Sequence, residues 1–147
     1  MAWSASGLYV KNFIDILDAS QLAINLVDTT ADKWALFNNS VSAEVLYGTA
    51  TAYTTTNEVS GTGYTAGGQT VASPTLAQQA DLSIMMYDMG DQTWTTATVT
   101  AYGAILYSTQ GSNSALVGLT FGGAYTSTAG NFTIAFSTNG VFTIDLY

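Results

Sequence analysis

Short runs of β-branched and aromatic residues, separated by glycine, asparagine and serine, follow one another from residue 81 to the C-terminus. Val, Ile, Thr, Tyr, Phe and Trp favour strands because their side chains pack well on a pleated surface. Short strands at this spacing are typical of an antiparallel β-sandwich or a barrel-like domain. We expect strands over residues 82–87, 93–107, 115–121, 131–136 and 141–147. The second of these is longer than most strands, so it should bend, cross between sheets or carry a bulge near Gly103.

The last two predicted strands form a hairpin whose loop length can be chosen from the hydrophobic pattern. Asn139 and Gly140 alone suggest a two-residue turn, but that turn would place the apolar residues of the two strands on opposite faces. A three-residue loop over residues 138–140, with Gly140 left-handed after a type I turn, places them on one face. It predicts the pairs Phe136–Phe142, Ile134–Ile144 and Phe132–Leu146.

The first part of the chain has a weaker β pattern. Leu22, Ile24 and Leu26 occupy every second position, and Trp34 and Leu36 follow the same period. These residues predict two strands between residues 21 and 37, joined by a turn near residues 28–32.

The N-terminal segment has a helical period. Apolar residues at i, i+3, i+4 and i+7 predict a short helix over residues 8–17. We expect an N-terminal arm or helix over residues 1–20 and a single β domain over residues 21–147. The helix either packs on its own sheet or docks on a neighbouring protein. Because aromatic residues anchor interfaces, Trp3 and Tyr9 are candidate contact residues.

A glycine-rich loop over residues 57–68 interrupts the β domain. It lacks the Lys-Ser/Thr ending and the strand–loop–helix setting of a phosphate-binding loop. Its glycines either serve turns that need positive φ or let the loop lie on a partner protein. The candidate partner contacts of the loop are Asn57, Glu58, Tyr64, Gly67 and Gly68.

The residue types that are missing exclude most enzyme classes. The chain has no His, no Cys and no Arg, and its only basic side chains are Lys11 and Lys33. Ser-His and Cys-His nucleophiles, and zinc, haem or iron–sulfur sites of the usual ligands, are therefore excluded. Asp88 and Asp91 favour a solvated turn over a calcium site, since the EF-hand spacing is absent. We expect no enzyme activity, no cofactor and no metal.

The formal net charge of −8 limits the partners. Nucleic-acid binding needs cations that neutralise phosphates, so we expect no nucleic-acid and no membrane partner. The N-terminus lacks the basic segment and apolar run of a signal peptide, which predicts synthesis in a cytoplasm without an export address. The three tryptophans, Trp3, Trp34 and Trp94, favour core or interface packing over a sugar-binding platform.

Several segments, taken in order, resemble small virion proteins of tailed bacteriophages, especially actinobacterial phages. The segments are residues 57–68, Trp94, residues 101–107, Phe121 with Gly122, and residues 130–134. The sequence departs from that pattern at Tyr102, where a basic residue often stands, and at Thr120, where an acidic one does. Any salt bridge between those two positions is missing here.

The resemblance implies a capsid decoration (cement) or minor capsid protein on the virion, outside the shell, assembled in the host cytoplasm. The implied partners are the major capsid protein and further copies of the chain, with a trimer favoured. Two alternatives stay open: a tail, neck or fibre component of the same particle, and a carbohydrate-binding module or carboxylate glycosidase.

Overall fold

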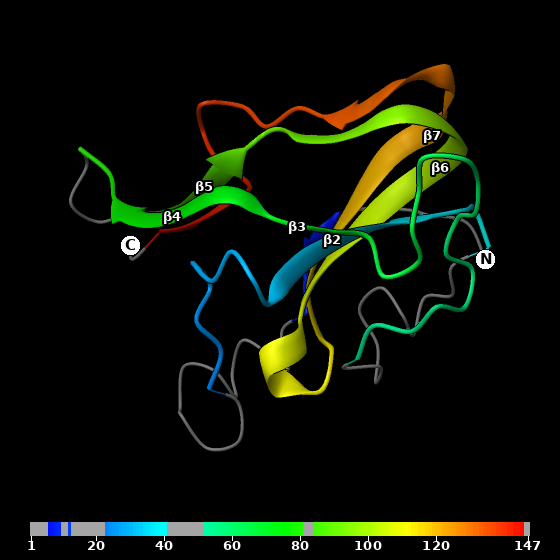
Figure 1. Ribbon diagram of the computed structural model, residues 1–147. Coiled ribbons are helices and arrows are strands. Elements are labelled where there is room, and N and C mark those ends of the chain that lie inside the picture. Colours follow the sequence, from blue (N-terminus) through cyan, green and yellow to red (C-terminus); the bar gives the residue numbers. More distant parts are fainter. Residues whose placement is uncertain (1–5, 10–11, 13–22, 41–51, 81–83, 146–147) are drawn as a thin grey trace.

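The computed structural model describes residues 6–9, 12, 23–40, 52–80 and 84–145. The protein is mainly β, as the sequence predicts, and its strands form two antiparallel sheets (Figure 1). Within the described ranges the strands are β1 (Gly7–Leu8), β2 (Asp32–Phe37), β3 (Gln69–Thr70), β4 (Ala72–Gln78), β5 (Ile84–Gly90), β6 (Gln92–Ser108), β7 (Ser114–Ile134) and β8 (Phe142–Asp145). A 3-10 turn, η1 (Thr109–Gly111), connects β6 to β7.

The larger sheet has the order β1-β7-β6-β2-β3 and is built around the hairpin of β6 and β7. β2 lies beside β6 and is buried on both faces. Its Trp34 and Leu36 side chains belong to the main core, and Ala35 and Phe37 belong to a second, smaller core cluster. A strand buried on both sides explains why its apolar residues form a continuous run instead of alternating.

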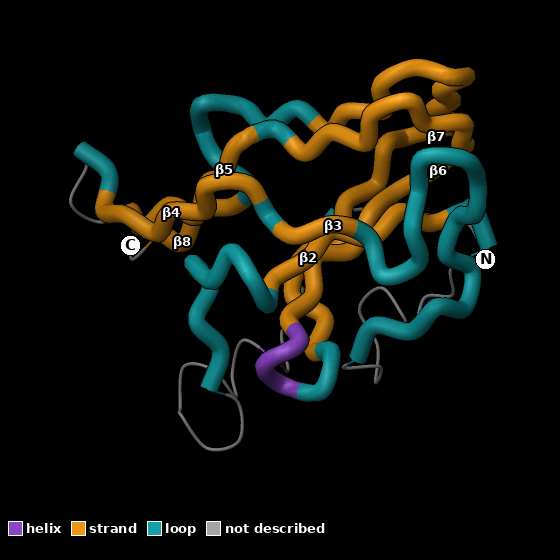
Figure 2. The backbone as a smooth tube through the Cα atoms, viewed as in Figure 1, coloured by secondary structure: helices purple, strands orange, loops and turns teal. Residues whose placement is uncertain are grey.

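The hairpin of β6 and β7 is bent, and Figure 2 shows its far half curling over the rest of the sheet. Between the pairs Ala101–Tyr125 and Gly103–Thr120, β6 contributes one residue and β7 contributes four, residues 121–124. Gly122, in this excursion, has a φ of 75°. Of the three irregularities expected for this strand, a bulge is therefore found near Gly103, but its extra residues lie on β7 and not on β6.

The predicted strands over residues 115–121 and 131–136 are wrong as separate elements, because β7 runs through both positions. The glycines at 122 and 123 make a bulge within a strand instead of a turn between strands. Because β7 curls, Phe132 from its far half and Leu116 from its near half reach the same core.

The smaller sheet has the order β4-β5-β8 and corrects the predicted C-terminal hairpin. The turn is as predicted: the Gly140 N–H donates to the Ser137 carbonyl at 2.9 Å, and Gly140 has a φ of 76°. The strand pairing is wrong, because β8 pairs with β5, placing Phe142 opposite Tyr87. β7 is instead paired with β6 at Phe132 and Ile134. Leu146 lies outside the described residues.

Two predictions for the first part of the chain also need correction. The predicted helix over residues 8–17 is wrong at its start: Leu8 belongs to β1 opposite Val117, and the Tyr9 N–H donates to the Leu116 carbonyl at 3.0 Å. Pairing with the β7 edge satisfies backbone groups more securely than a short helix, which is marginal by itself. Residues 10–11 and 13–17 lie outside the described part of the chain.

The predicted strand between residues 21 and 28 is wrong over residues 23–27, which form an irregular segment and a turn. The Asp28 N–H closes this turn on the Asn25 carbonyl at 3.1 Å, and the Asp28 carboxylate holds the next turn, over residues 28–31, by accepting from the Thr30 and Ala31 N–H groups at 2.7 and 3.1 Å. A second acceptor oxygen binds the Gln110 side chain at 2.8 Å. Side-chain capping of this kind competes with strand pairing. The predicted strand around Trp34 is confirmed as β2.

Candidate functional site

The glycine-rich loop over residues 57–68 is organised around one carboxylate. The half-buried Glu58 side chain accepts hydrogen bonds from the Tyr53 hydroxyl at 2.5 Å, the Tyr64 hydroxyl at 2.6 Å and the Gly67 N–H at 2.8 Å. Two of these donors lie within the loop and one precedes it. Hydrogen bonds to a charged group are stronger than neutral ones, so Glu58 closes the loop on itself.

The closed loop is also fastened to the larger sheet. The Val59 N–H donates to the Leu36 carbonyl at 2.9 Å, and the Thr98 N–H of β6 donates to the Thr62 carbonyl at 2.9 Å. The Tyr64 hydroxyl accepts from the Leu36 N–H at 2.9 Å, so this side chain joins the sheet to Glu58. The loop is therefore tied to strands β2 and β6.

Glycine is required where the loop backbone crosses the sheet most closely. At Gly68 the φ is 69°, and a Cβ would lie 1.8 Å from the Trp34 carbonyl oxygen. At Gly61 a Cβ would lie 2.1 Å from the Thr98 carbonyl oxygen. Real Cβ atoms do not approach oxygens so closely, so side chains at these two positions would lift the loop from β2 and β6.

The tyrosine hydroxyl groups around Glu58 and Gly67 remain protonated near neutral pH and so remain donors. Burial raises the pKa of Tyr53 and of Tyr64 well above the usual range, and the Glu58 charge and hydrogen bonds raise both further. Burial and the Glu58 charge raise the pKa of Tyr107 to about 12. The Tyr107 hydroxyl donates to the Gly67 carbonyl at 2.7 Å, and its ring stacks on Tyr53 at 4.0 Å.

Most of the predicted partner contacts have roles inside the domain. Glu58, Tyr64 and Gly67 close the loop, and Gly68 lets it approach β2. Tyr9 is 3 % exposed and belongs to the second core cluster. Asn57 has a positive φ of 67°, and its amide donates to the Ser40 carbonyl. Trp3 lies outside the described residues.

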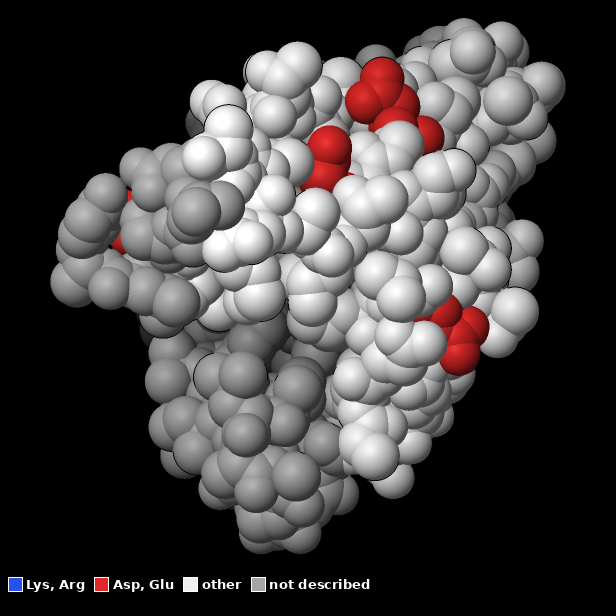
Figure 3. Space-filling model, turned by 90° about the vertical axis from the view of Figure 1, so that its left-hand side faces the viewer, with Lys and Arg blue, Asp and Glu red and all other residues white. Residues whose placement is uncertain are grey.

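The outward surface of the loop consists of small, uncharged residues that the sequence did not single out. The exposed ones are Ser60, Gly61, Thr62, Gly63, Thr65 and Ala66. Beside them lies a groove of about 410 Å³ between the loop and the bent hairpin, lined mainly by Ser and Thr with Glu58 at one side. On the face shown in Figure 3, Asp and Glu form separate spots in a neutral surface.

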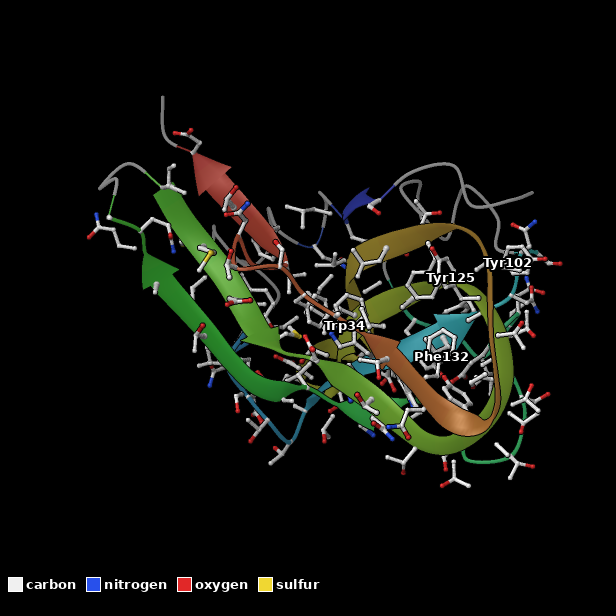
Figure 4. All side chains as sticks on the ribbon, turned by 90° about the horizontal axis from the view of Figure 1, so that it is seen from above. Trp34, Tyr102, Tyr125 and Phe132 are labelled. Atoms are coloured by element: carbon white, nitrogen blue, oxygen red, sulfur yellow. The ribbon has the colours of Figure 1, made fainter. Side chains whose placement is uncertain are left out.

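A second hollow, of about 450 Å³, lies in the bend of β7. The residues that line it include Phe121, Tyr125 and Phe132, together with Asn131 and Thr133, which alternate with the buried Phe132 along the strand. Figure 4 shows Tyr125 and Phe132 within the curve that β7 makes. By contrast, Trp34 and Trp94 are completely buried and form no exposed platform.

The carboxylate of Asp32, at the start of β2, contrasts with that of Glu58. The residue is completely buried, and neither carboxylate oxygen has a hydrogen-bond donor in bonding geometry among the described residues. Burial raises its pKa to about 6, with the nearby Ser108 hydroxyl opposing the shift and the Asp28 charge adding to it.

Asp88 and Asp91 accept hydrogen bonds from the backbone. The Asp88 carboxylate accepts from the neighbouring Met89 N–H at 2.8 Å, and the Asp91 carboxylate accepts from the Phe136 N–H at 3.0 Å. In the part of the chain that the structure describes, no three carboxylates gather as a metal site would require.

No helix of the described residues is long and apolar enough to cross a membrane. No protein-family model, curated protein or solved structure matches this chain.

Proposed function

We propose that the chain is a virion structural protein: a capsid decoration (cement) protein that binds the outside of a phage shell and stabilises it. Its partners are the major capsid protein and further copies of the chain, in a homo-oligomer for which a trimer is favoured. It assembles on the particle in the host cytoplasm, and its two sheets form a sandwich-like or barrel-like adhesive domain.

The observation that carries this proposal is the closed glycine-rich loop. Because Glu58 and the sheet hold the loop in place, its exposed surface over residues 60–66 is preorganised for contact. Preorganisation lowers the entropic cost of binding, which a surface of small side chains needs in order to bind firmly. Neither lysine lies in the loop, so this contact does not use ion pairs with acidic groups of the partner.

The electrostatics agree with a position outside the shell. A chain with a net charge of −8 is repelled by packaged nucleic acid and is favoured on the outer surface. Trp, Val, Leu, Phe and Ile side chains buried along β6 and β7 give the domain a core of its own, so it can bind as a preformed unit.

The test is binding of the purified protein to phage shells that lack it. Thr65→Lys places a charge on the exposed loop surface, and Thr143→Lys, on the exposed side of β8, is the matched control. We expect the first variant to bind shells at least about tenfold more weakly and the second to bind like the wild type. Equal binding of the two variants would argue against the loop as the contact surface.

Copy number in purified virions tests the assignment itself. A decoration protein should be present in proportion to the shell protein, and antibody labels should decorate the head. A copy number far below that of the shell protein, or labels on the tail alone, would favour the tail, neck or fibre alternative.

A further inference from the structure

Strand β4 forms an outer edge of the smaller sheet and is exposed on both faces over its second half. The sheet order is β4-β5-β8, and the three strands extend away from the larger sheet (Figure 4). Residues 75–78 are all exposed, and Leu76 is 43 % exposed. An edge strand of this kind presents backbone N–H and C=O groups that can pair with another chain.

The hydrogen bonds of β5 show which backbone groups of β4 face outward. Residues along an antiparallel strand direct their N–H and C=O groups alternately to the two neighbouring strands. The Ile84 carbonyl accepts from the Gln79 N–H, on the β4 side, at 2.9 Å. The Tyr87 carbonyl accepts from the Val141 N–H, on the β8 side, at 2.8 Å. Because Tyr87 bonds toward β8, Leu76, which lies directly opposite it, directs its own N–H and C=O to the outer edge.

Leu76 also ends a row of apolar side chains that crosses the smaller sheet. Phe142 of β8 lies opposite Tyr87 of β5, and Tyr87 lies opposite Leu76 of β4, so all three share one face. The Tyr87 side chain is completely buried and its ring centroid is 5.2 Å from that of Phe142, whereas Leu76 is largely exposed. A further strand beside β4 would continue the row and cover Leu76.

The other sheet edges that the structure describes are less suited to pairing. At the edges of the larger sheet, β1 and β3 have two residues each. At the other edge of the smaller sheet, β8 carries the exposed Asp145. Short strands and charged side chains are common means by which proteins prevent edge pairing. By contrast, β4 has no charged residue, and Pro74 with the adjacent bulge protects only its first half.

We propose that β4 pairs with β4 of a second copy of the chain, antiparallel and about a twofold axis. Directly opposite residues share a face, and Leu76 bonds outward, so the register that joins the exposed apolar side chains places Leu76 opposite Leu76 of the second copy. The N–H of each Leu76 then donates to the carbonyl of the other. The smaller sheets of the two copies become one sheet, and their apolar rows meet at the axis.

The charges favour this edge and a second copy as its partner, although each chain has a net charge of −8. Asp88 on β5 lies opposite Thr75, on the other face from Leu76. Two copies of Asp88 would be three strand spacings apart, about 14 Å, so salt screens most of their repulsion. Pairing through β8 would instead place two copies of Asp145 on adjacent strands, where like charges destabilise. A twofold contact needs one patch that fits itself, and β4 supplies an uncharged one.

The contact is small, so it should be weak. Four exposed residues from each copy bury well under the roughly 1,200 Å² of a stable interface, and we expect a micromolar or weaker dissociation constant. A twofold contact joins chains in pairs, so the protein in solution should be a dimer, or a hexamer if the favoured trimer also forms. The glycine-rich loop takes no part, so the pairing does not depend on shell binding.

Sedimentation equilibrium of the full chain over a range of concentrations measures the pairing. Leu76→Lys places two ammonium groups opposite each other at the axis and should weaken the pairing at least about tenfold. Thr143→Lys is the matched control, because it adds the same charge at an exposed position of β8, the far edge of the same sheet. The control should assemble like the wild type. Circular dichroism of both variants establishes that they are folded.

Cross-linking tests the register. The chain has no Cys, so Leu76→Cys introduces a single thiol. The Cα atoms of a hydrogen-bonded antiparallel pair are about 5.5 Å apart, within the range that a disulfide spans. Leu76→Cys should therefore form a covalent dimer under mild oxidation, and Thr143→Cys should form it far more slowly.

Three results would overturn the proposal. They are a wild type that stays a monomer or a single trimer up to millimolar concentration, equal assembly of Leu76→Lys and the wild type, or equal cross-linking of the two cysteine variants. Equal assembly would mean that the copies meet through another surface. Thr65→Lys should retain the pairing, so that a failure of the shell-binding proposal stays distinguishable from a failure of this one.

Discussion

The carboxylates of Glu58 and Asp32 are both shielded from water, but their hydrogen-bonding surroundings differ. Around Glu58 three donors converge on the carboxylate, and the glycine-rich loop is closed by it. Around Asp32, at the start of β2, burial is complete and the carboxylate oxygens have no donor in bonding geometry among the described residues. The same functional group is thus a structural centre in one region and a buried group with a desolvation cost in the other.

The difference indicates that hydrogen bonds to a carboxylate, and not its burial alone, decide what it contributes to the stability of the fold. A charge that accepts several hydrogen bonds replaces its lost water ligands, whereas an unpaired charge keeps the full cost of desolvation. Accordingly, burial raises the pKa of Asp32 to about 6, so the neutral form is favoured below about pH 6. Four substitutions separate these effects.

The largest effect should come from blocking the close approach of the glycine-rich loop to β2 at Gly68. Gly68→Ala combines a φ of 69° with a Cβ only 1.8 Å from the Trp34 carbonyl oxygen. We expect it to lower the free energy of unfolding by at least about 3 kcal/mol, measured by urea denaturation. Gly122→Ala is the control: its φ is 75°, but a Cβ there meets nothing within 4 Å. Backbone strain alone should cost the control about 1 kcal/mol; equal losses would show that the close contact is unimportant.

Removing the satisfied carboxylate itself should have the next largest effect. Glu58→Ala leaves two tyrosine hydroxyl groups and the Gly67 N–H without their acceptor, and should cost about 2–4 kcal/mol. Amide hydrogen exchange at Gly67 should accelerate, since the loop loses its centre. Asp88→Ala removes a carboxylate that accepts from the Met89 N–H, and should cost less than about 1 kcal/mol. If Gly67 stays protected in Glu58→Ala, the loop is held by the sheet and not by Glu58.

The unsatisfied carboxylate should make stability depend on pH in the opposite direction from most acidic groups. The pKa of Asp32 is raised from 3.8 to about 6, so its contribution is complete below the ordinary value and is lost as the pH rises through 6. Between pH 4 and pH 8 this loss amounts to about 3 kcal/mol at most. Asp32→Asn should therefore be more stable than the wild type at pH 8, and the difference should disappear near pH 4.

Asp28→Asn provides the control for the sign of that effect. Hydrogen bonds from Thr30 lower the pKa of Asp28, so its contribution is present at neutral pH and is lost as the pH falls. The Asp28 variant should be less stable than the wild type at pH 7, and the difference should shrink in acid. Urea denaturation at pH 4, 6 and 8 measures both variants. A wild type whose advantage over Asp32→Asn grows toward pH 8 would contradict the account of Asp32.

The sequence pattern predicted the strands better than their partners. The strand around Trp34 and the long strand over residues 93–107 are found, because side-chain period is a local property, whereas the extra residues of the bulge near Gly103 lie on β7. The pairing of β8 was predicted wrongly because the turn at Gly140 fixes only the local geometry. Which strand lies beside Phe142 is decided by long-range packing. Here the Phe142 ring packs on the Tyr87 ring, with ring centroids 5.2 Å apart.

The same limit applies to the candidate site. The glycine-rich composition located the loop, but the donors to Glu58 include Tyr53, which lies before the loop. The sequence contains a signal that would have suggested part of the network, a carboxylate six residues before Tyr64 within a glycine-rich segment. Nothing local marks Asp32 as buried, since the acidic segment around it has the composition of an exposed turn. Its burial follows from the pairing of β2 with β6.

The smallest effect should come from a buried polar group that carries no charge. The Ser127 hydroxyl is buried between the two hollows and has no hydrogen-bond partner among the described residues. An unpaired hydroxyl costs far less to bury than an unpaired carboxylate, so Ser127→Ala should stabilise the protein by about 1 kcal/mol at every pH. Thermal denaturation at pH 5 and pH 8 measures both the gain and its independence of pH. A loss of stability would show that the hydroxyl is satisfied by bound water, and the contrast between satisfied and unsatisfied groups would then apply to the charged residues alone.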